Sequence, residues 1–132
     1  MKKILALGVL LAFFTAAPLP AAAQGWVRYA QTEEGLMYFD SLRTRKMGDT
    51  AFVWDLHDMP GIATDDSGKQ FRSVLYAVEY QCRAKKRRVL SMTRHTEHMG
   101  VGAAASEETV VSEWREASAD SLGGELFKHI CE

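Results

Sequence analysis

Sequence features that commonly indicate a function are scarce in this chain. Its N-terminal apolar run, residues 4–14, is shorter than the roughly 20 residues that cross a bilayer, so no membrane span is expected. Its 16 basic residues are balanced by 17 acidic ones, which does not favour a nucleic-acid binder. No serine stands in a nucleophile elbow, and no cysteine stands in a catalytic motif. We therefore expect a protein that is not an enzyme.

The first residues determine the expected compartment. Residues 1–3 carry positive charge, residues 4–14 are apolar, and prolines and small residues follow up to Ala23. This three-part pattern is typical of a secretory signal peptide, and we place cleavage after Ala23. No cysteine lies near that point, so no lipid anchor is expected. Residues 1–23 are thus predicted to be a signal peptide, and residues 24–132 to form one domain that is periplasmic, secreted or at the cell surface.

The sequence contains only two cysteines, Cys82 and Cys131. In an exported domain this number favours an intramolecular disulfide over a metal site or a reactive thiol. The bridge would close a loop of roughly 50 residues, for which the chain-entropy model gives about 4 kcal/mol of stabilisation. Because both thiols are then consumed, thiol catalysis is not expected.

The clearest alternating pattern lies in residues 70–82. Its larger side chains recur at every second position, which predicts a β-strand with one buried face. That face would carry Val74, Tyr76, Val78, Tyr80 and Cys82. Because Cys82 belongs to it, the predicted disulfide would clamp the C-terminus onto this face.

Five further segments are predicted to be strands, and three consecutive ones form a meander. The predicted strands are residues 24–30, 36–39, 50–58, 87–96 and 103–111. In residues 50–58 we expect the bulky side chains of Phe52, Trp54 and Leu56 to point inward. The three tryptophans of the chain, Trp26, Trp54 and Trp114, are expected in the core.

The segments between these strands carry turn residues. Residues 59–68 hold Pro60, two glycines and two aspartates, which predicts an exposed hairpin loop. Asp40 or Ser41 is expected to cap a single helical turn through residues 42–45.

The C-terminal segment changes to a helical period. Its apolar residues fit one broad helical face, with Ser118 or Ser121 as the N-cap. That face would carry Leu122, Leu126, Phe127, Ile130 and Cys131. Gly123 and Gly124 each lower helix stability by up to about 1 kcal/mol, so the helix must be held by packing and by the disulfide.

Two groups of residues have side chains of the kind found in functional sites. His57, His95 and His98 are candidate metal ligands. In a strand, however, the spacing of His95 and His98 puts their side chains on opposite faces, and no second ligand pair lies nearby in sequence, which favours ordinary surface histidines. The densest charged feature is a basic cluster made of Arg83, Lys85, Lys86, Arg87 and Arg88. It is a candidate partner-binding site for acidic polymers or proteins; the alternative is a solvated hairpin turn whose lysines discourage edge pairing.

Short motifs along residues 26–131 resemble the surface-adhesin protein E family of small exported bacterial proteins. The matching motifs are Trp26-Val27, Tyr38-Phe39-Asp40 before Ser41, Val53-Trp54, Tyr80-Gln81-Cys82 before the basic turn, residues 99–102, Glu113-Trp114 and residues 126–131. Each motif is weak alone, whereas their order and the two-cysteine frame together are specific.

The resemblance implies an α+β fold, a single antiparallel sheet of about six strands with a C-terminal helix tethered by the disulfide to its concave face. It also implies a binding protein that needs no cofactor and contacts protein partners such as host matrix or serum proteins. A second copy of this chain, forming a homodimer, is a further expected partner. This sequence lacks the lipid-attachment cysteine of a surface-anchored member. The alternative function is a soluble periplasmic protein that binds haem or metal through His57, His95 and His98.

Overall fold

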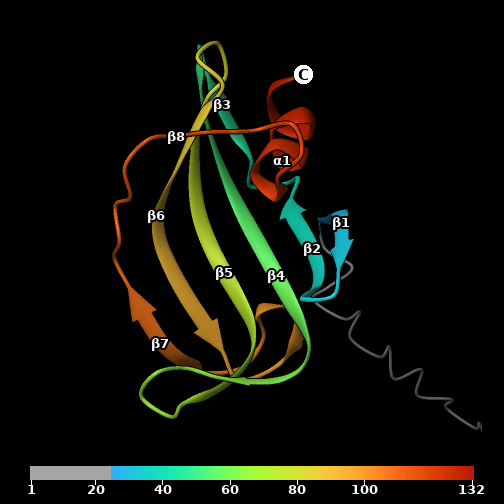
Figure 1. Cartoon of the computed structure of the whole chain (residues 1–132), viewed down its shortest axis with the longest axis vertical. Helices are drawn as coiled ribbons and strands as arrows, with labels where there is room; N and C mark the ends of the chain where they lie inside the picture. Colours follow the sequence, from blue (N-terminus) through green and yellow to red (C-terminus); the bar gives the residue numbers. More distant parts are fainter. Residues whose placement is uncertain (1–24) are drawn as a thin grey trace, which may run out of the picture.

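A computed structural model describes residues 25–132, and the expected signal peptide with its cleavage site lies outside them. The described chain forms one curved antiparallel sheet with a helix packed against one face (Figure 1). We call the face under this helix the inner face and the opposite one the outer face. The strands are β1 (Trp26–Thr32), β2 (Gly35–Asp40), β3 (Arg45–Met47), β4 (Thr50–Thr64), β5 (Gln70–Gln81), β6 (Lys86–His95), β7 (Ala104–Glu108) and β8 (Arg115–Glu116). A short 3-10 turn, η2 (His98–Gly100), and the helix α1 (Leu122–Cys131) complete the structure.

The sheet has eight strands, and its main path runs in the order β1-β2-β4-β5-β6-β7. The predicted α+β architecture is confirmed, but the expected number of about six strands is too low. The two additional strands are β3, which pairs with β4, and β8, which pairs with β6. They contain three and two residues, too few for an alternating pattern to be visible in the sequence.

The expected orientation of β4 is wrong at its first half. Ala51, Val53 and Asp55 point to the inner face and are almost completely buried, whereas Phe52 lies on the outer face with 37% of its surface exposed. The register explains this arrangement, because Ala51 and Val53 pair with Tyr80 and Val78 of β5 under the helix. Small side chains leave room there for α1. Among the three residues expected inward, only Leu56 is fully buried, on the outer face beneath Gly100 of η2.

Two turns differ from expectation. Strand β4 continues through Pro60 to Thr64, so the predicted loop 59–68 shrinks to a tight turn after it. The strand tolerates Pro60 because an irregularity in the register lies between Asp58 and Ala63. After β2, Asp40 does cap the following residues, accepting from the amides of residues 42 and 43, but these form a turn and no helix.

Helix α1 lies over one end of the inner face. Ser121 is its N-cap and accepts a hydrogen bond of 3.1 Å from the amide of Gly124, as one of the two expected alternatives. The buried cluster beneath it consists of Phe39, Ala51, Val53, Val78, Tyr80, Leu126, Phe127 and Ile130. Val74 is buried outside this cluster, and Leu122 lines a cleft at the start of the helix. The expected contacts of α1 with Val78 and Tyr80 are therefore confirmed, whereas the expected contact with Val74 is wrong, because Val74 lies outside the cluster beneath the helix.

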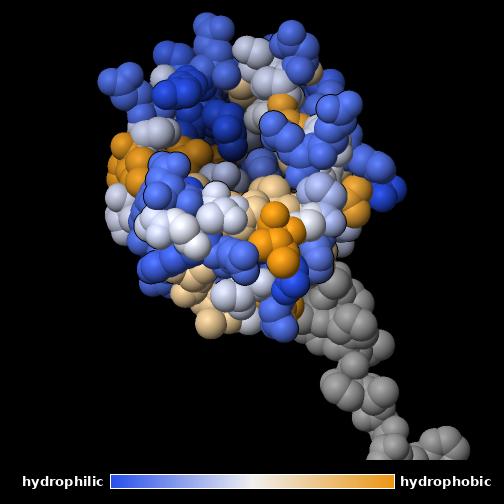
Figure 2. Space-filling model, turned by 60° about the horizontal axis from the view of Figure 1, so that its bottom comes forward, coloured by the Kyte–Doolittle hydropathy of each residue, from blue (hydrophilic) through white to orange (hydrophobic). Residues whose placement is uncertain are grey.

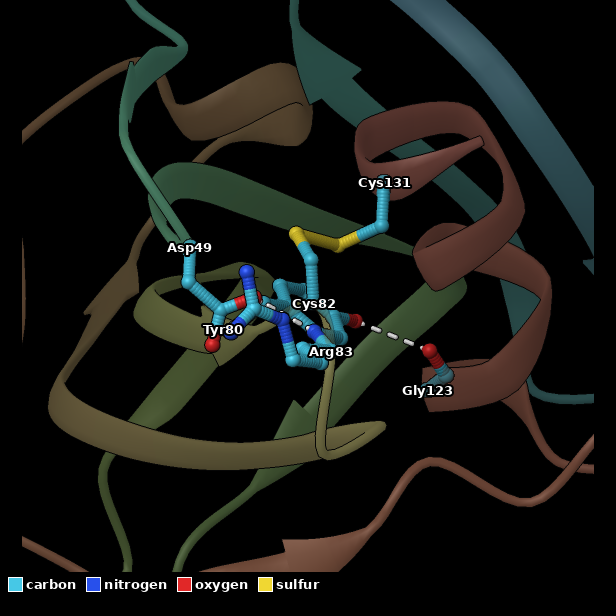
Figure 3. Close-up of a disulfide and its surroundings, with 6 residues drawn as sticks. All are labelled: Asp49, Tyr80, Cys82, Arg83, Gly123 and Cys131. Carbon is cyan, nitrogen blue, oxygen red and sulfur yellow. Dashed lines mark hydrogen bonds between the residues drawn. A yellow bond between two sulfur atoms is a disulfide. The ribbon is translucent and has the colours of Figure 1, made fainter.

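The predicted disulfide joins Cys82, directly after β5, to Cys131 in the last turn of α1 (Figure 3). The backbone at Cys82 is fixed independently, because its amide donates to the carbonyl of Asp49 at 2.8 Å. Near the other end of the helix, the hydroxyl of Tyr80 donates to the carbonyl of Gly123 at 2.9 Å. Strand β5 thus holds α1 at both of its ends.

We predict that replacing both cysteines with serine lowers the free energy of unfolding by roughly 2 to 5 kcal/mol. The loss should appear first in α1, because its two glycines give it poor intrinsic helicity. Amide hydrogen exchange of residues 122–131 measures this directly, with the protection of β5 as the internal reference. Equal protection of α1 in the oxidised and double-serine proteins would show that packing alone holds the helix.

Candidate functional site

The most prominent side-chain cluster on the outer face is built around Arg43. Its guanidinium carbon lies 5.4 Å from the ring centre of Trp54 and 6.0 Å from that of Trp26. Asp40, which is buried, forms an ion pair with the Nε of Arg43. Phe52 follows the same face two positions before Trp54 on β4. We call Trp26, Arg43, Phe52 and Trp54 the aromatic patch.

Two depressions flank Arg43. One of about 360 Å³ reaches from Trp26 toward His95 and η2, and the other of about 210 Å³ lies between Phe52, Trp54 and Leu90. Both are open to solvent and combine aromatic walls with the same guanidinium. The patch therefore presents a shaped surface around one arginine, whose charge is balanced by Asp40.

The expectation that all three tryptophans lie in the core is wrong. None of them belongs to the buried core, and each one packs against an arginine. Trp114 lies under Arg88, whose guanidinium carbon is 4.4 Å from the ring centre. Arg88 also forms a 2.8 Å ion pair with Glu79 of the neighbouring strand. No local pattern in the sequence indicates these pairs, because their members come from different segments.

Strand β6 separates the residues of the basic cluster, because it carries three of them and its neighbouring side chains point to opposite faces. Arg83, Lys85 and Lys86 are exposed at the turn between β5 and β6. Arg87 points to the inner face and Arg88 to the outer face, as neighbouring residues of a strand must. Only the first three residues, which we call the basic tip, form a freely exposed charged surface.

A buried polar centre lies on the inner face beside the helix. Asp55 is only 2% exposed, accepts from the hydroxyl of Tyr29 at 2.7 Å and lies 3.2 Å from Nε2 of His57. Arg87 approaches the same carboxylate at 3.9 Å. Burial, reinforced by the charge of Asp55, raises the pKa of the Tyr29 hydroxyl well above its usual range. The carboxylate is thus a buried acceptor that keeps Tyr29 protonated.

The three histidines are not assembled into a metal site. His57 contacts Asp55 on the inner face, His98 contacts Asp58, and His95 lies near the carbonyl of Gly102. Within residues 25–132, no group of three or more histidine, cysteine, aspartate or glutamate side chains is arranged to hold a metal ion. In the same residues, no helix has both the length and the apolar content for crossing a membrane.

Figure 2 turns the lower end of the molecule forward and shows a hollow bordered by hydrophilic side chains, with hydrophobic ones in small groups beside it. Apolar surface on this view is therefore divided into small areas. The aromatic patch differs from such small groups because its members are held together by one arginine.

Comparison with known proteins gives a family and a fold. The sequence model described as surface-adhesin protein E matches residues 26–132. A structure of Haemophilus influenzae protein E aligns with a TM-score of 0.68 at 15% identity, covering 88% of this chain and 90% of that chain. Protein E from non-typeable Haemophilus influenzae aligns with a TM-score of 0.66 at 16% identity, covering 88% of this chain and 81% of that chain. No curated protein sequence matches.

We predict that Tyr80 makes stability fall in alkaline solution. Burial raises its pKa to about 12 in the folded protein, above the ordinary value of about 10. Between these values the unfolded chain releases a proton that the folded protein keeps, so the free energy of unfolding decreases as pH rises from about 10 to about 12. Tyr80→Phe should lose about 1 kcal/mol at neutral pH, because the hydrogen bond to Gly123 is lost.

Urea unfolding at a series of pH values, with the ultraviolet absorbance of tyrosinate as a second readout, tests this linkage. Above pH 10 the stability of Tyr80→Phe should decline less steeply than that of the wild type, while Tyr29 and Tyr76, whose pKa values are also raised by burial, maintain part of the slope. Identical slopes for the two proteins would contradict the assignment.

Proposed function

Because this chain belongs to the surface-adhesin protein E family, we propose that it is an exported, non-enzymatic protein that binds protein partners. Extracellular-matrix and serum proteins of a host are the partner class that we propose. The polar centre at Asp55 does not suggest catalysis, because its carboxylate is enclosed and already bonded to Tyr29.

The aromatic patch carries this proposal. Tryptophan, tyrosine and arginine are the residues that contribute most to binding energy at protein interfaces. Trp26 and Trp54 are half-buried, and Arg43 is held between them by its ion pair with Asp40. Because these contacts limit the positions open to the side chains, we propose that a partner packs on them with a small loss of conformational entropy.

The basic tip supplies a second element of the proposed interface. Arg83, Lys85 and Lys86 extend into solvent in a protein whose overall charge is slightly negative. Exposed charges of this kind accelerate association with an acidic surface more than they increase final affinity. Of the other two members of the basic cluster, Arg88 stacks on Trp114 and Arg87 lies against the helix. We therefore propose that both act in binding mainly by shaping the surface beside the tip.

We predict that Trp54→Ala reduces affinity for a protein partner by about tenfold or more, since truncation of an interface tryptophan commonly costs at least 2 kcal/mol. The measurement is biolayer interferometry of the oxidised protein against a panel of immobilised matrix and serum proteins. Val111→Ser is the control, because Val111 is a well-exposed apolar residue far along the chain from the patch. Near-ultraviolet circular dichroism verifies that both variants are folded.

Two results would contradict the proposal in different ways. Failure of the wild type to bind any protein of the panel would refute the proposed partner class. Binding that Trp54→Ala weakens no more than Val111→Ser would remove the aromatic patch from the interface.

The basic tip leads to a kinetic prediction. Lys85→Gln combined with Lys86→Gln should slow association with an acidic partner by about tenfold at low salt and leave dissociation nearly unchanged. Added salt should reduce the difference between variant and wild type. The matched control is Lys69→Gln with Lys128→Gln, which removes the same charge from exposed positions outside the basic tip and the aromatic patch. Equal slowing in both variants would assign the effect to net charge alone.

A further inference from the structure

A cleft of about 580 Å³ opens where strand β6, the β7–β8 connection and the start of α1 meet. It lies apart from the aromatic patch. Its lining includes Arg87, Val89, Val110, Arg115, Glu116 and Leu122. Its walls therefore combine arginines with short apolar side chains.

Arg87 lines this cleft, and its guanidinium is only partly satisfied by the rest of the chain. Its Nε is buried and has no hydrogen-bond acceptor among residues 25–132. The nearest carboxylate, Asp55 at 3.9 Å, is already bonded to Tyr29 and lies close to His57. A mostly buried guanidinium is normally paired and hydrogen-bonded, since leaving a charged donor without an acceptor destabilises the folded protein. Arg87 thus retains donor capacity that its own chain leaves unused.

A second arginine stands directly opposite the first. Strand β8 pairs with β6 so that Arg115 faces Arg87 across the strands. Residues in such a pair share one face of the sheet at roughly 5 Å between Cβ atoms, where like charges repel. Arg115 forms no ion pair with another residue of the described chain. The two-residue strand therefore holds two positive charges together at an energetic cost.

The remaining charged groups at the cleft do not cancel this pair. Arg88 is on the other face of β6, where Glu79 and Trp114 engage its guanidinium. Glu116 also lines the cleft, but it pairs in register with Lys86 and forms no ion pair with Arg87 or Arg115 in the described chain, so one carboxylate stands against three arginines. The local balance at the mouth of the cleft is positive.

We propose that this cleft binds a small amphiphilic oxyanion, a carboxylate or phosphate group carried on a short apolar chain. The anion bridges the guanidinium groups of Arg87 and Arg115, whose forked donors match an oxyanion in bidentate geometry. The apolar chain lies against Val89, Val110 and Leu122. The bound anion offsets the repulsion between the two arginines. A binding role therefore explains why the fold places Arg115 opposite Arg87.

The test is an amide NMR titration of the exported, oxidised protein with hexanoate, hexyl phosphate and inorganic phosphate. Hexanoate or hexyl phosphate should give saturable shifts at Arg115, Leu122 and Gly123, and the tighter of the two identifies the preferred headgroup. Inorganic phosphate should bind more weakly than hexyl phosphate, because it makes no apolar contact. Arg115→Gln should weaken binding about tenfold, as expected for loss of a charge-assisted hydrogen bond.

Arg83→Gln is the matched control, because it removes the same charge from the exposed basic tip outside the cleft. It should leave the affinity within about twofold of the wild type, since exposed charges at a distance are screened. The proposal is overturned if neither amphiphile gives saturable shifts, or if Arg83→Gln and Arg115→Gln weaken binding equally. Because Trp54 is not part of the cleft, these outcomes are independent of protein-partner binding at the aromatic patch.

Discussion

The structure depends on the attachment of α1 to the end of strand β5. The helix has ten residues and two glycines, so it lacks the length and the propensity to be stable alone. Yet Gly124 is required where it stands, and Gly123 lets the helix pack closely on Arg87. A Cβ atom at Gly124 would collide with the backbone carbonyl of Ser118, and one at Gly123 would collide with the side chain of Arg87. The same residues that weaken the helix allow it to approach the sheet, and the disulfide and Tyr80 offset their cost.

This attachment also determines what the two faces of the sheet have available for binding. A single sheet has two faces, and α1 covers only one end of one of them. On the outer face η2 covers Leu56 and Ser73, while Trp26 and Trp54 stay partly open to solvent. One arginine, Arg43, lies over both rings on this face, where no helix covers them. The aromatic patch is thus a consequence of a fold with one incomplete covering layer.

The order of several individually weak motifs allowed the family to be predicted. The sequence also allowed the long strands, the helix, a serine cap at Ser118 or Ser121 and the disulfide to be predicted, because each of these leaves a strong local signal or a simple count. It did not allow the facing of β4 to be predicted, since alternation reveals a period of two but not which set of residues is buried. Side-chain size favoured Phe52 and Trp54 as the inward set. The helix reverses this choice, because only Ala51 and Val53 leave space for Leu126 and Phe127 beneath it.

The functional surfaces were harder to predict than the fold because they depend on neighbours across strands. In the sequence, residues 83–88 form one basic cluster. In the structure the strand period sends Arg87 and Arg88 to opposite faces, where one meets a buried carboxylate and the other a tryptophan. Arg115 is far from this cluster along the chain, yet two residues of pairing place it opposite Arg87. The sheet therefore separates basic residues that are close in sequence. It also brings Arg87 and Arg115 together, although no run of basic residues surrounds Arg115.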